Sequence, residues 1–383
     1  MLDDVLHALR PRWSNLIDDP ATFRLQICMT PLVRRGTVIA PATETFRADA
    51  EYFYPASTVK LLAAVCAIRA VRRIQTQNEW QRFDLDTPLE YLPENADPIS
   101  GDETNRDGGT LTLRHCIRRA LIVSENPPHN RLYEFLGHAE INADLRAMGF
   151  VDAVINHRLD DVRTPEQQRT TPRIVTRLPD GSRREFPRRV GPTLPYPSGI
   201  SHTGVGIGHF REGALVSTPM EFAAPGAEKN RVRLADLHSL VATLAPSPAS
   251  DLHTATSLGI TVEDVEFLRR CMTMLPRESG NPEYDPTTYP DDYVKPTLLG
   301  VRSITPHAEI MNKLGWAYGF VTDASVVHTM NASSAADRHA VAVSYTMWAC
   351  SRGVLNNDEY DYEELAKPFA KDLGRALWER LIA

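Results

Sequence analysis

The sequence predicts an α+β fold, in which one antiparallel sheet is flanked by helices and a second lobe is all helical. Two observations lead to this class. Extended segments lie near both ends of the chain, at 23–54 and 309–349, whereas helical patterns dominate the region between them. The early hairpin needs the late strands to complete a sheet, so neither end is expected to fold alone. The 383 residues are enough to bury a large core.

The individual elements follow from the periodicity in order along the chain. A helix over 1–18 precedes a hairpin of strands over 23–32 and 45–54, and a long apolar helix over 57–74 is the expected central pillar. Further helices are expected within 111–148 and over 233–245, 262–274 and 363–382, and strands over 309–316, 319–330 and 339–349. These elements predict one domain over 1–383, with a sheet lobe at 1–55 and 300–383 and a helical lobe at 56–299.

A long segment over 157–208 departs from this regular pattern. It contains several prolines and arginines and little periodicity. Stretches of this length in a globular enzyme are usually lids, binding loops or insertions, and we expect an insertion in the helical lobe. The glycine-rich run 201–209 is expected to be a flexible loop, because no Cys or carboxylate cluster accompanies His202 and His209 with metal-ligand spacing.

The composition excludes several kinds of partner. Acidic residues outnumber basic ones, 49 to 42, and no basic stripe with interleaved aromatic residues is present, so nucleic acid is not an expected partner. The apolar runs, such as 61–67, are too short to cross a bilayer. Residues 1–18 lack the basic start and apolar centre of a signal peptide, which leaves a cytoplasmic protein or an exported one whose signal sequence has been removed. The oligomeric state is open.

The five cysteines are too few and too scattered for a disulfide framework. We expect Cys66 and Cys116, on two of the predicted helices, to be buried free thiols. Neither a metal nor another cofactor is expected from the motifs of the chain.

Chemistry is first indicated by Ser57 and Lys60, at the start of the apolar helix. A serine and a lysine three residues apart lie on one helix face, within a side chain's reach of each other. Pro55 suits a helix start, and the helix N-terminus directs unpaired N–H groups at whatever lies beside Ser57. A lysine in an apolar pocket can lose its proton and act as a base for a serine hydroxyl. The spacing predicts an activated nucleophile; the alternative is a helix cap with an exposed lysine.

Two further motifs follow in order along the chain. Ser124-Glu125-Asn126 lies between two amphipathic stretches, and Lys313-Leu314-Gly315 lies in a predicted strand. With the first motif, this trio resembles the Ser-x-x-Lys, Ser-Asp-Asn and Lys-Thr-Gly motifs of class A β-lactamases and penicillin-binding proteins. The flanks "IVSENPPHNRLYEFLG", "NKLGWAYGFVTDASVV" and "INHRLDD…RTTP" look like that superfamily's helix–loop–helix, third-motif hairpin and omega loop. The resemblance covers roughly two-thirds of the chain.

The resemblance implies a fold like that of β-lactamases and DD-peptidases, in a single catalytic domain, with a site built on these motifs. Ser57 would be the nucleophile and Lys60 its base. Ser124 would relay a proton towards the leaving group and bridge Lys60 and Lys313. Lys313 would also orient Ser124 and attract an anionic substrate.

The same resemblance assigns binding roles to three more residues. Asn126 would bind both Lys60 and a substrate carbonyl or amide. Gly315 would leave the strand open, so that a substrate can lie along its edge. The backbone N–H groups of Ser57 and Trp316 would form the oxyanion hole.

The chain departs from the family pattern within two of the motifs. Glu125 replaces the aspartate of the second motif and is expected to face away from the substrate. Leu314 replaces the threonine or serine of the third motif. The family's hydroxyl binds a substrate carboxylate, which leucine cannot do.

A third departure lies in the omega-like loop. Arg163 stands where the family's deacylating glutamate would fall, and Asp160, Asp161 or Glu166 can substitute, with no spacing argument to select one. Efficient penicillin hydrolysis is therefore not expected. Across the neck of the loop, we expect an ion pair between Asp161 and Arg169; two solvated charges are the alternative.

The leading hypothesis is a serine hydrolase that forms an acyl-enzyme at Ser57 with an amide or ester, acts on a small molecule or peptide, and hydrolyses β-lactams weakly. A D-alanyl-D-alanine carboxypeptidase or transpeptidase is the second hypothesis, and it requires export. A penicillin-binding-like module without turnover is the third. The presence of all the motif serines and lysines argues against that last hypothesis, since a site without catalytic activity has no need for them.

Overall fold

The computed structural model describes residues 1–383 except 78–79, 198, 200 and 247–250. Its described residues divide into two compact units. The sheet unit comprises Met1–Thr58, Pro197–Asp251 and Asp292–Ala383, and the helical unit comprises Val59–Tyr196 and Leu252–Asp291. The predicted α+β class is confirmed by this combination of an antiparallel sheet and helices.

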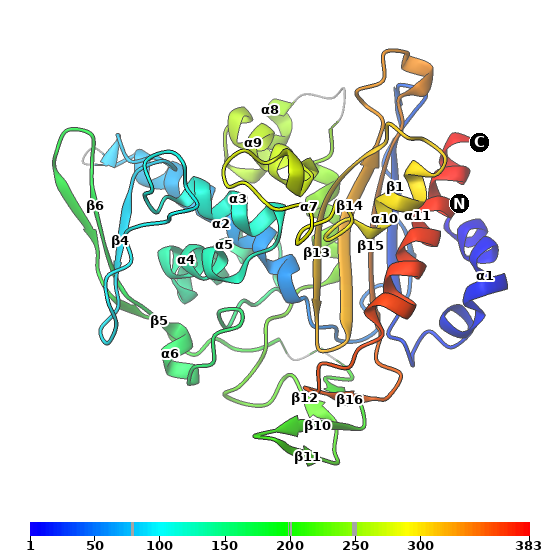
Figure 1. Ribbon diagram of the computed structural model, residues 1–383, viewed down its shortest axis with the longest axis horizontal. Coiled ribbons are helices and arrows are strands. Elements are labelled where there is room, and N and C mark those ends of the chain that lie inside the picture. Colours follow the sequence, from blue (N-terminus) through cyan, green and yellow to red (C-terminus); the bar gives the residue numbers. More distant parts are fainter. Residues whose placement is uncertain (78–79, 198, 200, 247–250) are drawn as a thin grey trace. The chain divides into compact units, whose positions relative to one another are not determined.

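The sheet unit is built on a six-stranded antiparallel sheet (Figure 1). Ile27 of an early strand lies between Phe46 and Tyr345, so early and late strands share one sheet, as predicted. Tyr318 and Gly319 form the turn between the strands Glu309–Ala317 and Phe320–His328. Both residues have a positive φ, which is typical of a type I′ hairpin. The strand order is β13 (Glu309–Ala317), β14 (Phe320–His328), β15 (Ala340–Trp348), β1 (Gln26–Arg34) and β2 (Thr37–Val38), with β3 (Glu44–Phe46) also paired to β1.

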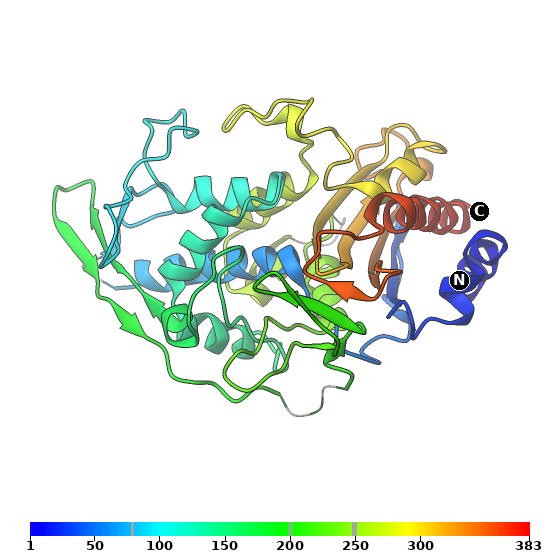
Figure 2. The same ribbon diagram turned by 60° about the horizontal axis from the view of Figure 1, so that its bottom comes forward.

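Three helices lie on one face of this sheet. α1 (Leu2–Asp18) and α11 (Lys367–Ile382) occupy the same side in Figure 1 and Figure 2, and Trp13 of α1 meets Phe369 of α11 edge to face at 5.6 Å between ring centres. α10 (Pro296–Arg302) packs closely on α11. A Cβ at Gly300 or Gly374 would overlap backbone of the facing helix, so this approach requires both glycines.

The opposite face of the sheet is covered by α7 (Leu234–Thr243). His238 of α7 lies between two strands, with its ring nitrogens 2.8 Å from Thr30 Oγ1 and 3.1 Å from Ser344 Oγ. Tyr345, the next residue of β15, instead meets Phe369 of α11, with ring centres 6.1 Å apart. This alternation of side chains along β15 identifies the two faces of the sheet.

The helical unit surrounds α2 (Val59–Gln75), whose residues from Val59 to Ile68 are all buried. This is the predicted central helix, preceded by the 3-10 turn η1 (Ala56–Thr58) of the sheet unit. The neighbouring helices are α3 (Leu113–Ile122), α4 (Asn126–Leu136), α5 (His138–Ala147) and α9 (Val262–Thr273), with α6 (Pro165–Arg169) and α8 (Asp251–Leu258) as shorter ones. Small sheets are formed by β4 (Leu89–Leu92), β6 (Arg173–Arg177) and β7 (Arg183–Phe186), and by β5 (Thr170–Thr171) and β8 (Arg189–Val190).

The segment 157–208 is more regular than its sequence predicts, since it holds α6 and the strands β5 to β9. The expectation of a loop over 201–209 is wrong, because β9 (Gly204–Val205) and β10 (Gly208–Arg211) lie there. Pro197–Asp251 belongs to the sheet unit, whereas the sequence-based prediction placed this region in the helical lobe over 56–299. Strands this short carry too little periodicity to be recognised in a sequence. β9 pairs with β12 (Met220–Glu221), and β10 pairs with β11 (Ala214–Val216) and with β16 (Val354–Leu355).

Two sequence-based expectations concern the chain as a whole. Cys66 and Cys116 are buried and unpaired, as predicted, and the other three cysteines are also buried free thiols. Among the residues that the structure describes, no helix has the length and apolar character needed to cross a membrane.

Candidate active site

Ser57 lies in η1, the single turn that leads into α2. Thr58 fixes this turn, because its backbone nitrogen and its Oγ1 both donate to the Pro55 carbonyl, at 3.0 and 2.7 Å. Ala56 has a φ of +45°, a left-handed conformation that is uncommon for a residue with a side chain. Such conformations concentrate at functional sites, where surrounding contacts hold them in place. The turn therefore presents the half-buried Ser57 in a defined orientation.

Gly315 brings β13 directly against this turn. A Cβ built at Gly315 would lie 2.7 Å from the Pro55 carbonyl oxygen, 2.7 Å from the Ser57 nitrogen and 2.8 Å from the Thr58 nitrogen. All three are backbone atoms, which cannot move aside as the end of a flexible side chain can, so only glycine fits without a shift of the chain. Within the sheet unit, the structure thus brings together two of the predicted residues, Ser57 and Gly315.

Lys60 meets the second motif inside the helical unit. It is fully buried in the first turn of α2. Its Nζ donates to Asn126 Oδ1 at 2.7 Å, lies 3.2 Å from Ser124 Oγ, and also donates to the Ser124 carbonyl oxygen. The carbonyl and amide oxygens can only accept hydrogen bonds, whereas the Ser124 hydroxyl can either accept a hydrogen bond from Nζ or donate one to it. Three predicted site residues are therefore joined by hydrogen bonds.

Ser124 lies between α3 and α4 and has a φ of +68°. It thus adopts the left-handed conformation, as Ala56 does next to Ser57. The adjacent Glu125 is held by Arg119, whose Nε lies 3.1 Å from both carboxylate oxygens, and by the Tyr284 hydroxyl, which donates at 3.0 Å. Arg119 also donates to Asp102 at 2.5 Å. Glu125 faces this network, which anchors the loop that carries Ser124.

Lys313 is almost completely buried on β13, with 1% of its surface exposed. Its Nζ donates to the Leu314 carbonyl oxygen at 2.7 Å. Burial lowers the pKa of Lys313 to about 7; the negative charge of Asp323 opposes this shift, and the positive charge of Lys295 adds to it. The charge of Lys313 therefore changes close to neutral pH.

Side chains alternate along β13, so Leu314 and Trp316 face away from the side that Gly315 presents to η1. Leu314 is only 2% exposed and contributes to the core. The Trp316 ring lies 5.6 Å from the Tyr362 ring, and the Lys367 ammonium group lies 5.4 Å from its centre. The third motif therefore has a buried leucine where the family has a hydroxyl.

The omega-like loop is anchored by Arg158, a residue that sequence reasoning did not select. Arg158 is fully buried, and its Nε donates to Glu134 Oε1 of α4 at 2.9 Å. Its terminal nitrogens donate to the carbonyl oxygens of Gln168 and Thr170, at 3.2 and 2.7 Å. One guanidinium group thus ties the beginning of the loop both to its end and to α4.

The predicted ion pair between Asp161 and Arg169 is wrong. Asp161 pairs with Arg163, whose Nε lies 2.9 Å from both carboxylate oxygens, and Arg169 donates to the Gly191 carbonyl oxygen at 3.2 Å. A partner two residues away satisfies the Asp161 carboxylate more directly than one across the neck of the loop. The other acids of this loop, at 160 and 166, are exposed on its surface.

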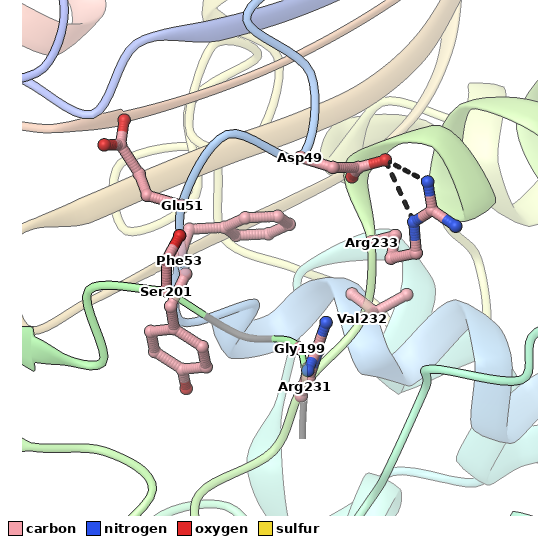
Figure 3. Close-up of a pocket in the computed structure, with 9 residues that line it drawn as sticks. Asp49, Glu51, Phe53, Gly199, Ser201, Arg231, Val232 and Arg233 are labelled. Atoms are coloured by element: carbon pink, nitrogen blue, oxygen red, sulfur yellow. Dashed lines mark hydrogen bonds and ion pairs between the residues drawn. The ribbon is translucent and has the colours of Figure 1, made fainter. Parts of the chain in front are cut away.

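A small pocket lies beside the segment that precedes Ser57 (Figure 3). Its lining includes Phe53 and the ion pair of Asp49 and Arg233, in which Nη2 lies 2.7 Å from Oδ2. With a volume of about 40 Å³ it has room for a water molecule but not for a substrate. In the described part of the chain, no group of three or more His, Cys, Asp or Glu residues is arranged to hold a metal ion.

The predicted site residues fall into two groups. Ser57, Lys313, Gly315 and Trp316 belong to the sheet unit, and Lys60, Ser124 and Asn126 belong to the helical unit. Contacts join Ser57 to Gly315 in the first group and all three residues in the second. The bridging of Lys60 and Lys313 by Ser124 stays a prediction, as does the oxyanion hole of Ser57 and Trp316.

Sequence reasoning also missed Asp323 and Lys295, which act on the charge of Lys313. A signal for Asp323 was present, because it is the one acidic residue in the otherwise apolar and hydroxylated stretch 320–327. No comparable sequence signal marks Lys295, since it follows a run of polar and turn-forming residues.

Comparisons with known proteins agree with the motifs. A model of the "Beta-lactamase enzyme family" matches residues 39–180, which include the first two motifs. No curated protein matches the sequence.

Solved structures share the fold over nearly the whole chain. A variant of PBP-A in an acyl-enzyme complex with penicillin G has a TM-score of 0.51 at 14% identity, covering 97% of this chain and 95% of that chain. A β-lactamase from Xanthomonas campestris pv. campestris has a TM-score of 0.50 at 14% identity, covering 99% of both chains. A β-lactamase from Desulfarculus baarsii has a TM-score of 0.50 at 16% identity, covering 99% of this chain and 98% of that chain. The chain therefore has the fold of these β-lactamases and of PBP-A, and its residues 39–180 match the β-lactamase enzyme family.

Proposed function

We propose that the protein is a serine hydrolase that forms an acyl-enzyme at Ser57 with an amide or ester substrate. The observation that carries this proposal is the buried Lys60, whose Nζ is held by Ser124 and Asn126. In its neutral form, the Lys60 amine can accept a proton and act as a base for a serine hydroxyl. Its contact with Ser124 joins the first motif to the second.

The proposed reaction proceeds in two stages. Lys60 accepts the hydroxyl proton of Ser57 as the serine oxygen attacks the substrate carbonyl carbon. The backbone N–H groups of Ser57 and Trp316 stabilise the resulting oxyanion, a contribution of about 3 kcal/mol for each donor. Ser124 gives its proton to the leaving group as the bond between that group and the carbonyl carbon breaks, and it regains a proton from Lys60, which becomes neutral again. Water then attacks the ester carbonyl carbon, the bond to the Ser57 oxygen breaks, and one proton of the water returns to Ser57 as the acid product leaves.

We propose that β-lactams acylate the protein slowly and leave a lasting adduct. Leu314 offers no hydroxyl to a substrate carboxylate, a loss of roughly 1.5–3 kcal/mol for a hydrogen bond to a charged group. Arg163 stands where the family has its deacylating glutamate, and its guanidinium group is paired with Asp161. The two departures act on different steps, acylation and deacylation. The natural substrate is then an amide or ester that does not need recognition of a carboxylate by the third motif.

The position of β13 favours a second candidate, a D-alanyl-D-alanine carboxypeptidase or transpeptidase. β13 is the terminal strand of the sheet order in the described residues, and Gly315 lies beside Ser57 on it. An extended peptide can add to such an edge as a further strand. Hydrolysis of D-Ala-D-Ala peptides in preference to p-nitrophenyl esters would select this candidate.

The test is covalent labelling of Ser57 by a fluorophosphonate and by a fluorescent penicillin, followed by peptide mass spectrometry. We expect one adduct, on the peptide that contains Ser57. Ser57→Ala should abolish labelling while the protein stays folded, and Ser333→Ala, at an exposed serine, should label like the unmodified protein. Absence of any adduct at Ser57 with both reagents would leave the non-catalytic binding module as the better description.

A further inference from the structure

Three aromatic rings of the sheet unit meet beside the turn that carries Ser57. The Tyr318 ring meets the Tyr54 ring edge to face at 5.1 Å between ring centres and the Phe222 ring edge to face at 5.3 Å. The rings of Tyr54 and Phe222 are 5.8 Å apart. At these separations and angles aromatic side chains attract each other. Each ring therefore packs on the other two, and we call these three residues the aromatic cluster.

The aromatic cluster joins the two chain segments whose close approach forms the proposed oxyanion hole. Tyr54 lies three residues before Ser57, and Tyr318 lies three residues after Gly315. Gly315 is the residue at which β13 approaches the Ser57 nitrogen, and Trp316, the second proposed donor, follows it. The cluster therefore connects the two segments just outside the contact that places the two donors.

Phe222 is the member of the cluster that comes from a distant part of the chain. It follows β12 in the region 197–251 and is fully buried. Besides the two tyrosines of the cluster, it meets the rings of Tyr52 at 5.4 Å and Phe320 at 6.2 Å. Tyr52 and Tyr54 belong to the segment that leads into η1, whereas Tyr318 and Phe320 belong to the β13–β14 hairpin. One ring thus packs on two residues of each segment.

The backbone around Phe222 is tied to the segment that leads into η1. The Phe222 nitrogen donates to the Thr203 carbonyl oxygen at 3.1 Å, and the Phe222 carbonyl oxygen accepts from the Lys229 nitrogen at 2.8 Å. Arg24 is buried and donates to three carbonyl oxygens, those of Tyr52 at 2.9 Å, His202 at 2.7 Å and Gly204 at 2.8 Å. A single guanidinium group therefore links the strand segment that holds Phe222 to the segment before Ser57.

We propose that Phe222 is a positioning residue for the oxyanion hole, which braces the segment before Ser57 against the β13–β14 hairpin and so holds the backbone N–H groups of Ser57 and Trp316 in place. Donors to an oxyanion are effective only when their positions are fixed before the reaction. The consequence for the reaction rate rests on the proposed function. The restraint on the two backbone segments does not depend on catalysis.

The test compares two substitutions of the same kind in the full-length protein. Phe222→Leu removes the ring contacts of the aromatic cluster but keeps a buried apolar side chain. Phe369→Leu is the matched control, because Phe369 is also fully buried in the sheet unit and its ring meets those of Trp13 and Tyr345. If Phe222 serves only to fill the core, the two variants should behave alike. Urea unfolding shows that each variant is folded.

The first readout is the rate at which a fluorophosphonate labels Ser57 over a range of reagent concentrations. The oxyanion forms only as the bond to Ser57 is made, so displaced donors should reduce the limiting rate and not the affinity for the reagent. We expect the limiting rate to fall at least tenfold in Phe222→Leu, with the half-saturating concentration within twofold of that of the unmodified protein. Phe369→Leu should keep both values within twofold. Equal limiting rates in the two variants would overturn the proposal.

The second readout is backbone amide hydrogen exchange, measured by mass spectrometry on peptides that cover 53–60 and 313–320. Loss of the brace should let both segments open more often, so we expect exchange in both peptides to be about tenfold faster in Phe222→Leu. In Phe369→Leu, exchange in these two peptides should match the unmodified protein. Unchanged exchange in both peptides of Phe222→Leu would also overturn the proposal.

The outcomes separate this proposal from the proposed function. If the unmodified protein takes no label at Ser57, the proposed function fails, and the exchange rates alone decide whether Phe222 is a brace. If Ser57 is labelled but Phe222→Leu and Phe369→Leu react at the same limiting rate, the proposed function stands and the positioning role fails. If Phe222→Leu does not fold, Tyr318→Leu, at a half-buried residue, removes the same ring contacts from the hairpin side and should show the same loss in limiting rate.

Discussion

The α-carbon of Gly315 lies so close to the backbone of Ser57 that a Cβ added to it would stand 2.7 Å from the Ser57 nitrogen. That nitrogen is also one of the two proposed oxyanion donors. The geometry of the proposed nucleophile therefore depends on the absence of a side chain on a strand more than 250 residues away in the sequence.

We predict that Gly315→Ala slows acylation at Ser57 at least tenfold, because β13 or η1 must move to admit the methyl group and oxyanion donors need close placement. The free energy of unfolding should fall by about 1–3 kcal/mol, as for other overpacked sites. Urea unfolding and the rate of fluorophosphonate labelling measure the two effects. Gly280→Ala is the matched control, since a Cβ there meets no atom within 4 Å. Labelling of Gly315→Ala at the unmodified rate would show that the contact has no catalytic role.

We predict that Lys60→Met lowers the acylation rate by about 10²-fold or more, because the substitution removes the base but keeps an unbranched side chain of similar length. The measurement is the pre-steady-state rate of labelling over pH 5–10. Lys371→Met, at an exposed lysine of α11, should acylate normally. If Lys60→Met and Lys371→Met label at the same rate, another group is the base.

We predict that Arg158→Met destabilises the protein by about 2–4 kcal/mol, because buried carbonyl groups of the loop lose their donor and the Glu134 carboxylate keeps only its ion pair with Arg131. Arg163→Met removes a guanidinium group from the same loop, but its pair with Asp161 is partly exposed, so the cost should be within about 1 kcal/mol. Urea unfolding gives both values, and limited proteolysis should cut within 157–171 in the first variant only. Similar stability of the two variants would refute the anchoring role of Arg158.

We predict that stability falls as the pH drops from 6.5 towards 4 because of His238. Burial between α7 and the sheet lowers the pKa of His238 from 6.5 to about 4, so in this range the unfolded chain binds a proton that the folded chain does not. The stabilisation is complete above about pH 6.5 and is lost as the pH falls through the folded pKa, a change of about 3 kcal/mol. Urea unfolding at a series of pH values should show a weaker pH dependence in His238→Gln, whereas His253→Gln, at an exposed histidine, should match the unmodified protein. An unchanged slope in His238→Gln would contradict the assignment.

The sequence predicts the parts of the fold and site that are local or strongly periodic. The buried face of α2 and the strands β13 to β15 are long enough to show their period, and the cluster of Lys60 and Asn126 was expected from ordered motifs. Arg158 was not foreseen, because its role comes from burial against Glu134, 24 residues earlier, and from carbonyl groups that any sequence provides. The prediction of an ion pair between Asp161 and Arg169 was wrong for a related reason, because the nearer Arg163 binds the same carboxylate.

The most direct test of the account is the fate of the protein after mixing with benzylpenicillin, followed by intact-protein mass spectrometry over several hours with peptide mapping. The account predicts a slowly formed adduct of one penicillin per chain, located on the peptide with Ser57 and still present long after free penicillin is removed. Rapid conversion of benzylpenicillin to penicilloate without a lasting adduct would contradict it, and would show that one of the acids at 160, 161 and 166 activates water after all.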